Sequence, residues 1–130
     1  MLIRKSAEDY LETILMLKEK NGSVHSVDVA AELGFSKASV SVAMKKLRES
    51  GHLIMESDGE LKLTESGLAI ASSIYERHRT LTDFFIYLGV TPEVASEDAC
   101  KVEHDLSDET FQKLFQHVKL HMESVKNDAK

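Results

Sequence analysis

The sequence has one proline, one cysteine, no tryptophan and only 6% aromatic residues over 130 positions. With Cys100 as the single cysteine, the chain cannot form an internal disulfide, which fits a reducing cytoplasm. No apolar run approaches the roughly 18 residues of a membrane-spanning helix, and the N-terminus lacks the apolar stretch of a signal peptide. These absences predict a cytoplasmic protein without membrane contact. Because Pro92 is the only proline, most of the chain is free to be helical.

Positive charge is also in short supply, since 16 Lys and Arg stand against 22 Asp and Glu, a formal net charge of −6. Taken alone, this acidic balance argues against nucleic acid as a partner. The deficit is uneven, however. Residues 1–63 carry nine basic and ten acidic residues, whereas residues 64–130 carry seven and twelve. With 42% hydrophobic and 29% charged residues, the composition is that of a globular protein.

Serine residues placed before periodic apolar stripes predict the starts of three N-terminal helices, and glycines predict their ends. The expected caps are Ser6, Ser26 and Ser36, and the expected stops are Gly22, Gly34 and Gly51. The period then changes. Residues 53–55 and 61–63 flank a polar Asp58-Gly59 tip, which predicts a short β-hairpin.

After the hairpin the pattern returns to helix. Thr64 is expected to cap a long helix that ends at Leu88-Gly89, and Thr91 with Pro92 is expected to start a helix that passes Cys100. The last helix is expected to start at Ser107 and to carry one apolar stripe, formed by Phe111, Leu114, Phe115, Val118, Met122 and Val125. The predicted fold is mainly α, with domains at 1–63 and 64–130 and a connecting helix over 64–88.

Two short helices joined at Gly34-Phe35 and followed by a hairpin are typical of a winged helix-turn-helix. From residue 36 to 51 the chain has four basic residues and one acidic residue, so the local charge suits DNA. Small residues would let the second helix enter a major groove, and Val42, off the apolar stripe, could meet a thymine methyl group. The residues expected to face DNA are Ser36, Lys37, Ala38, Ser39, Ser41, Val42, Lys45 and Lys46, with Lys62 on the wing. The plain alternative is that the lysines form a solvated helix face, and the wing tip at Asp58 is acidic.

Side chains of the types that bind metal ions are scattered along the chain. Asp9 and Glu12 are spaced i, i+3 on the first helix, away from its apolar stripe, and His78 lies on the inward stripe of the long helix. Each has a simpler explanation as a helix-dipole partner or a core histidine. A more specific pattern places Cys100, Glu103 and His104 at i, i+3 and i+4 of one helix, since a divalent transition metal can use all three groups.

His117 and His121 are also spaced i, i+4, but they have no acidic neighbours. For these two histidines we expect surface or interface roles.

Three stretches occur in one order along the chain: residues 6–12 (SAEDYLE), 75–79 (YERHR) and 97–108 (EDACKVEHDLSD). Together they resemble the diphtheria toxin repressor and manganese transport regulator family of metal-dependent bacterial transcription factors. The resemblance covers essentially the whole chain. It implies a winged-helix DNA-binding domain, an all-helical dimerisation domain and up to two metal ions at their junction. The ligand positions that it implies are Asp9, Glu12, His78, Cys100, Glu103 and His104.

The ligand set mixes two branches of that family. Asp9 resembles the manganese-sensing branch, whereas Cys100 resembles the iron-sensing branch. Since a thiolate suits Fe(II), Co(II), Ni(II) or Zn(II) better than Mn(II), we expect Fe(II) as the physiological ion and Mn(II) as the second candidate. The expected function is repression of metal-uptake genes by a homodimer on a palindromic operator. The SH3-like third domain of the longer relatives is not expected.

Two other functions fit parts of the sequence. A winged-helix regulator could sense a small organic molecule or a redox signal through Cys100, but this leaves Asp9, Glu12, His78 and Glu103 without a shared purpose. A small metalloenzyme could use the same ligands to activate water. The sequence has neither a His-Glu-x-x-His helix nor a zinc-deaminase motif, so an enzyme is not expected.

Overall fold

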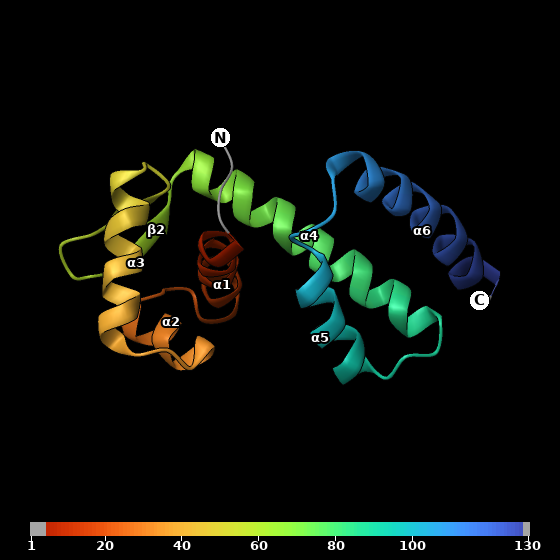
Figure 1. The fold of residues 1–130 in the computed structure, drawn as a ribbon, viewed down its shortest axis with the longest axis horizontal. Helices are drawn as coiled ribbons and strands as arrows, with labels where there is room; N and C mark the ends of the chain where they lie inside the picture. Colours follow the sequence, from red (N-terminus) through yellow and green to blue (C-terminus); the bar gives the residue numbers. More distant parts are fainter. Residues whose placement is uncertain (1–4, 129–130) are drawn as a thin grey trace. The chain divides into compact units, whose positions relative to one another are not determined.

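A computed structural model of the chain describes residues 5–128, with side chains for residues 6–121. This part of the chain contains six helices and one two-stranded antiparallel sheet (Figure 1). The elements are α1 (Lys5–Asn21), α2 (Ser26–Leu33), α3 (Lys37–Glu49), β1 (Leu53–Met55), β2 (Leu61–Leu63), α4 (Glu65–Tyr87), α5 (Pro92–Val102) and α6 (Asp108–Asp128). The predicted fold class and element order are therefore confirmed. Among the described helices, none combines the length and the apolar character needed to cross a bilayer.

The chain divides into two compact units, residues 1–73 and residues 74–130, and the division falls within α4. The first unit holds the three N-terminal helices, the hairpin and the start of α4. The second holds the rest of α4 together with α5 and α6. The predicted domain boundary between residues 63 and 64 stays a prediction.

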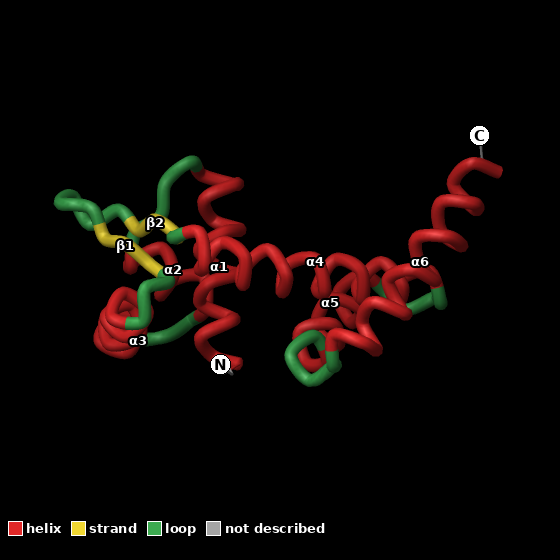
Figure 2. The backbone as a smooth tube through the Cα atoms, turned by 90° about the horizontal axis from the view of Figure 1, so that it is seen from above, coloured by secondary structure: helices red, strands yellow, loops and turns green. Residues whose placement is uncertain are grey.

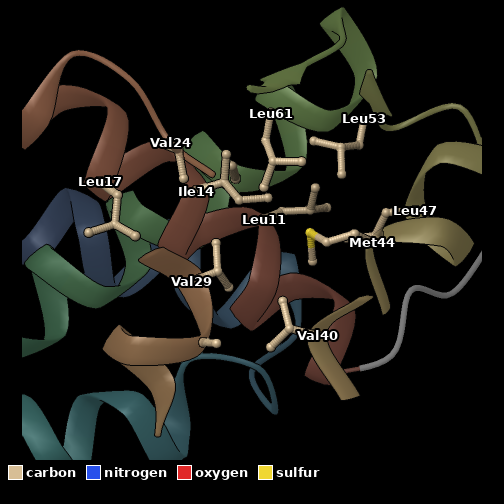
Figure 3. Packing of buried hydrophobic residues seen from close by; sticks show 12 residues of the cluster. Leu11, Ile14, Leu17, Val24, Val29, Val40, Met44, Leu47, Leu53 and Leu61 are labelled. Carbon is tan, nitrogen blue, oxygen red and sulfur yellow. The ribbon is translucent and has the colours of Figure 1, made fainter. Parts of the chain in front are cut away.

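The core of the first unit forms where α1, α2, α3 and the hairpin meet (Figure 3). One face of α1 supplies Leu11, Ile14 and Leu17, which match its predicted apolar stripe. The hairpin contributes Leu53 and Leu61, which are 2% and 1% exposed. The other labelled members are Val24, Val29, Val40, Met44 and Leu47. Burial of these side chains fixes the two short helices against α1 and leaves the outer face of α3 in solvent.

Three of the predicted helix starts are confirmed by capping hydrogen bonds. The hydroxyl of Ser36 accepts the backbone N–H of Ser39 at 3.1 Å at the start of α3. Thr64 accepts the N–H of Gly67 at 3.2 Å at the start of α4. Ser107 accepts the N–H of Thr110 at 3.1 Å at the start of α6. Each bond satisfies a backbone donor that the first turn of a helix leaves without a partner.

Other predicted helix ends are wrong by a few residues. The N-cap of α2 is His25, whose backbone N–H donates to the Asp28 carboxylate at 2.9 Å, so Ser26 is the first helical residue. Ser6 lies inside α1, because the chain is already helical at Lys5. Thr91 precedes α5 as predicted but makes no capping hydrogen bond with its side chain. In the predicted stripe of α6, the side chains of Met122 and Val125 lie outside the described residues.

The hairpin is the wing of the winged helix. Leu53 pairs with Leu63 and Met55 pairs with Leu61, so the predicted strands are confirmed. Figure 2 shows the two strands side by side with their connecting loop beyond them. The N–H of Leu61 also donates to the carbonyl of Val24 at 2.8 Å. This bond ties the wing to the loop between α1 and α2.

In the second unit, α4, α5 and α6 each carry buried apolar side chains. These buried side chains are Ile74, Leu81, Ala95, Ala99, Phe111 and Val118. Contacts of His78 on α4 with Ser96 on α5 and with Glu103 directly after α5 place the C-terminal half of α5 beside α4, where the candidate metal ligands lie.

Candidate metal centre and nucleic-acid interface

Three potential metal ligands come together within the second unit. They are His78 on α4, Cys100 on α5 and Glu103 directly after α5, and one ligand atom from each lies within 4.8 Å of the others. The set offers an imidazole nitrogen, a sulfur and a carboxylate oxygen. Such a mixed donor set suits a divalent first-row transition metal.

Glu103 is the centre of this group because its side chain is fully buried, with 0% exposure. Its Oε2 shares a hydrogen bond of 2.9 Å with Nδ1 of His78, and its Oε1 lies 3.4 Å from Nε2 of His104 and makes no hydrogen bond. A buried carboxylate is costly unless a positive charge or several donors accompany it. Two imidazoles and a buried carboxylate oxygen without a hydrogen bond therefore fit a site for a cation.

The predicted helical spacing of this group is only partly right. Cys100 lies on α5 as expected, but the helix ends at Val102, so Glu103 is its C-cap residue and His104 lies in the following turn. Glu103 keeps right-handed helical angles, with φ −57° and ψ −30°, and its N–H still bonds to the carbonyl of Ala99. The ligand types thus remain close together although His104 is outside the helix.

Arg77 supports the same turn and was not among the predicted site residues. It is 6% exposed, and its Nη1 donates to the backbone carbonyls of Glu103 at 3.0 Å and Leu106 at 2.6 Å. Its Nη2 pairs with the carboxylate of Asp108, and its guanidinium lies 5.1 Å from the ring centre of Phe111. The only sequence signal was that an arginine directly precedes His78. An arginine at this position of α4 cannot be told from a solvated one by sequence alone.

Ser96 also contacts the group without having been predicted. Its hydroxyl lies 3.4 Å from Nε2 of His78, whose side chain is 18% exposed. The two ring nitrogens of His78 therefore face a carboxylate and a hydroxyl. These contacts define the orientation of the imidazole within the second unit.

Asp9 and Glu12 lie on α1 in the first unit. The helical spacing places both residues away from the stripe of Leu11, Ile14 and Leu17, as predicted, but Glu12 is nevertheless buried, with 6% exposure, whereas Asp9 is half-buried. Burial of a carboxylate on the first helix is unusual for a simple helix-dipole role. The assignment of both residues to the metal site stays a prediction.

The side chains on α3 that were expected to face DNA are exposed, and their role in DNA binding stays a prediction. Val42 is 56% exposed, although valine on a soluble helix is usually buried. The side chains that lie in solvent around it are Ser36, Lys37, Ala38, Ser39, Ser41, Lys45 and Lys46. The face is basic and carries small residues near the helix start, as a major-groove helix requires.

The wing carries both charges. Lys62 is exposed, but its Nζ lies 3.7 Å from the carboxylate of Glu56. Glu60 in turn lies 3.6 Å from Nζ of Lys18 on α1. The positive charge of Lys62 is therefore partly balanced within the wing itself, and α3 carries the stronger positive surface.

Two family profiles match consecutive parts of the chain. Residues 2–61 match the N-terminal DNA-binding domain of the iron-dependent repressors, and residues 64–125 match their metal-binding and dimerisation domain. The chain belongs to the iron-dependent repressor family. The two matches correspond to the winged helix and to the helical part that contains His78, Cys100 and Glu103. Members of this family are metal-dependent transcriptional repressors and not enzymes, so the metalloenzyme alternative is set aside.

Relatives of the same family support this assignment. A helix-turn-helix-type transcriptional regulator of Methanocaldococcus jannaschii is 38% identical over 125 residues, covering 95% of this chain and 97% of the relative. The regulator MntR of Bacillus subtilis strain 168 is 36% identical over 102 residues, covering 78% of this chain and 72% of the relative.

Solved structures show the same fold. The manganese regulator SloR has a TM-score of 0.77 and 29% identity, with 92% of this chain and 55% of that chain covered. A manganese-dependent transcriptional repressor in complex with manganese has a TM-score of 0.79 and 29% identity, covering 87% and 52%. The chain thus spans about half the length of these two structures.

Proposed function

We propose that the chain is a cytoplasmic repressor that binds palindromic operator DNA as a homodimer when loaded with Fe(II), and that it controls genes for metal-ion uptake. The observation that carries this proposal is the group formed by His78, Cys100 and the buried Glu103. These residues lie within the part of the chain that matches the metal-binding and dimerisation domain of the family.

The proposed ligand set is Asp9, Glu12, His78, Cys100, Glu103 and His104, which could hold up to two ions. Glu103, buried between His78 and His104, would be a ligand to the ion, whose positive charge would compensate the buried carboxylate. The chain's own part is to present ligands from both units: Asp9 and Glu12 from α1, and the other four from the second unit. Ligands drawn from both units would favour one arrangement of the winged helix over others, which is how metal would promote DNA binding.

DNA recognition is assigned to the exposed face of α3. The first turn of α3, with Ser36 and Ser39, would hold a phosphate, and Lys37, Lys45 and Lys46 would contact the backbone. Val42 would contact base edges in the major groove. A two-fold dimer would place two such helices on half-sites about 34–36 Å apart.

Fe(II) is proposed over Mn(II) because of Cys100, whose thiolate is a soft ligand. Mn(II) is the second candidate, and it is supported by different observations. The relative from Bacillus subtilis is a regulator MntR, and of the two similar structures SloR is a manganese regulator and the other is a manganese-dependent transcriptional repressor. Co(II), Ni(II) and Zn(II) are expected to replace the physiological ion in vitro.

The deciding experiment is anaerobic DNA binding by the full chain, using a duplex selected from a random library in the presence of Fe(II). We expect tight binding with Fe(II), weaker binding with Mn(II) and none with a chelator. The variant Cys100→Glu should shift the metal preference for DNA binding toward Mn(II). The control Glu97→Gln, on the exposed side of α5, should change neither the metal preference nor the affinity for DNA. Equal binding in the presence and absence of metal would contradict the proposal and would favour a regulator that senses another signal.

A further inference from the structure

Two histidines lie together on α6, outside the group described above. His117 and His121 are one helical turn apart, and their ring centres are 4.1 Å from each other with a tilt of 40° between the ring planes. Both side chains are exposed. The proposed repressor mechanism does not use either residue.

Histidines spaced i, i+4 on a helix are a chelating pair, because both imidazoles project from the same face. One ion can then be bound by two nitrogens without any rearrangement of the backbone. Exposure matters here as well, since exposed side chains can rotate to aim a ring nitrogen at the ion and water can fill the remaining coordination positions. The two rings are in contact on the same face of α6, so one ion could contact a nitrogen of each.

We propose that His117 and His121 form a second metal site, which binds a late first-row dication such as Ni(II), Cu(II) or Zn(II) through two imidazoles and solvent. Imidazole is a ligand that these ions share, and affinity rises from Mn(II) through Co(II) and Ni(II) to Cu(II). Because the pair contains no carboxylate or thiolate, its affinity for Mn(II) should be low. Its selectivity therefore differs from that of the group around Glu103.

The surroundings of the pair set its strength. Lys113 lies one turn before His117 on the same face, and Lys119 lies between the two histidines in sequence, so the local charge is unfavourable for a cation. The site is accordingly expected to be weaker than one with acidic ligands and to depend on having both rings.

The test is calorimetric titration of the metal-free full chain with Ni(II), repeated for His121→Gln and His117→Gln. Wild-type chain should bind one more Ni(II) than either variant, and the remaining single imidazole should bind roughly 100-fold more weakly than the pair. The control Lys119→His/His121→Gln keeps six histidines but places two of them at i, i+2, on different faces of α6. This control should behave like His121→Gln.

A second readout identifies the site directly. Substoichiometric Ni(II) should broaden the ring C–H signals of both His117 and His121 in NMR spectra of the wild type, and neither remaining ring should respond as strongly in the single variants. Titration with Mn(II) should give the same stoichiometry for wild type and variants. If all variants bind Ni(II) with wild-type stoichiometry and affinity, the two rings merely stack and the proposal is wrong. We expect all of these variants to retain Fe(II)-dependent DNA binding.

Discussion

Arg77 donates from Nη1 to the backbone carbonyl of Glu103 at 3.0 Å, while the next residue, His78, bonds to the carboxylate of the same glutamate at 2.9 Å. Consecutive residues of α4 therefore hold Glu103 at its backbone and at its side chain. The second carbonyl bond, from Arg77 to Leu106, fixes the turn that follows α5. The position of the buried carboxylate is thus set by α4 as much as by α5.

Replacing Arg77 tests whether it positions this turn. We expect Arg77→Met to lower the free energy of unfolding by about 2–4 kcal/mol, because two carbonyl acceptors lose a charged donor. Asp108→Asn is the control, since the Asp108 side chain is 93% exposed and its pairing with Arg77 should contribute less than about 1 kcal/mol. Urea denaturation of both variants measures the difference. Metal affinity by calorimetry should fall in Arg77→Met and recover in part in Arg77→Lys. If Arg77→Met has the wild-type urea midpoint and the wild-type metal affinity, Arg77 does not position this turn.

Replacing Glu103 separates metal binding from folding. Glu103→Gln keeps the shape of the side chain but removes the charge that a cation requires, so the metal-free variant should fold with near wild-type helical content. Metal at 100 times its Kd should stabilise the wild type by about 2.7 kcal/mol, and the variant should not respond. Thermal denaturation with and without Fe(II) or Mn(II) measures this. Equal stabilisation of both proteins would show that Glu103 is not a ligand.

Gly67 in the first turns of α4 offers a test of packing against His52, the residue that precedes β1. A Cβ at this position would lie 2.0 Å from the carbonyl oxygen of His52. Helix propensity alone predicts that Gly67→Ala stabilises the protein by about 1 kcal/mol, whereas the steric contact predicts destabilisation by about 1–3 kcal/mol. We expect the second result in chemical denaturation. Ser72→Ala, on the exposed side of the same helix, should be nearly neutral.

The basic face of α3 predicts a particular dependence on salt. Removing one phosphate contact, as in Lys45→Ala or Lys46→Ala, should reduce the slope of log K against log salt concentration by about 0.9. Val42→Ala should leave this slope unchanged and alter the preference among operator sequences. Binding isotherms at several salt concentrations distinguish the two effects. If Val42→Ala lowers the affinity for all operator sequences by the same factor, Val42 does not contact a base.

Local signals were sufficient for most of the fold. The change from helical period to alternation located the hairpin, and Ser36, Thr64 and Ser107 act as the caps that their positions predicted. These features depend on residues only a few positions apart. The start of α2 was misplaced by one residue because serine is a common N-cap residue, which favoured Ser26. The actual N-cap is His25, whose backbone N–H donates to the carboxylate of Asp28.

The site was harder to predict where distant residues determine it. The residue types of His78, Cys100 and Glu103 could be selected from the sequence, and the structure brings these three together. The end of α5 at Val102 could not be predicted, because the carbonyls of Glu103 and Leu106 are satisfied by Arg77, more than 20 positions earlier. An inward arginine has no local signature that separates it from a solvated one.

The junction between α3, the wing and α4 has a consequence for the order of folding. The hydroxyls of Thr64 and Ser66 both donate to the carbonyl of Gly51, at 2.7 and 3.2 Å, and the N–H of Thr64 donates to the carbonyl of His52. The two hydroxyl bonds close loops of 13 and 15 residues, whose entropic cost is small. The wing is joined to the region before α2 by the longer-range Val24–Leu61 bond. We expect α3, the hairpin and the start of α4 to assemble first, with α1 docking onto them afterwards.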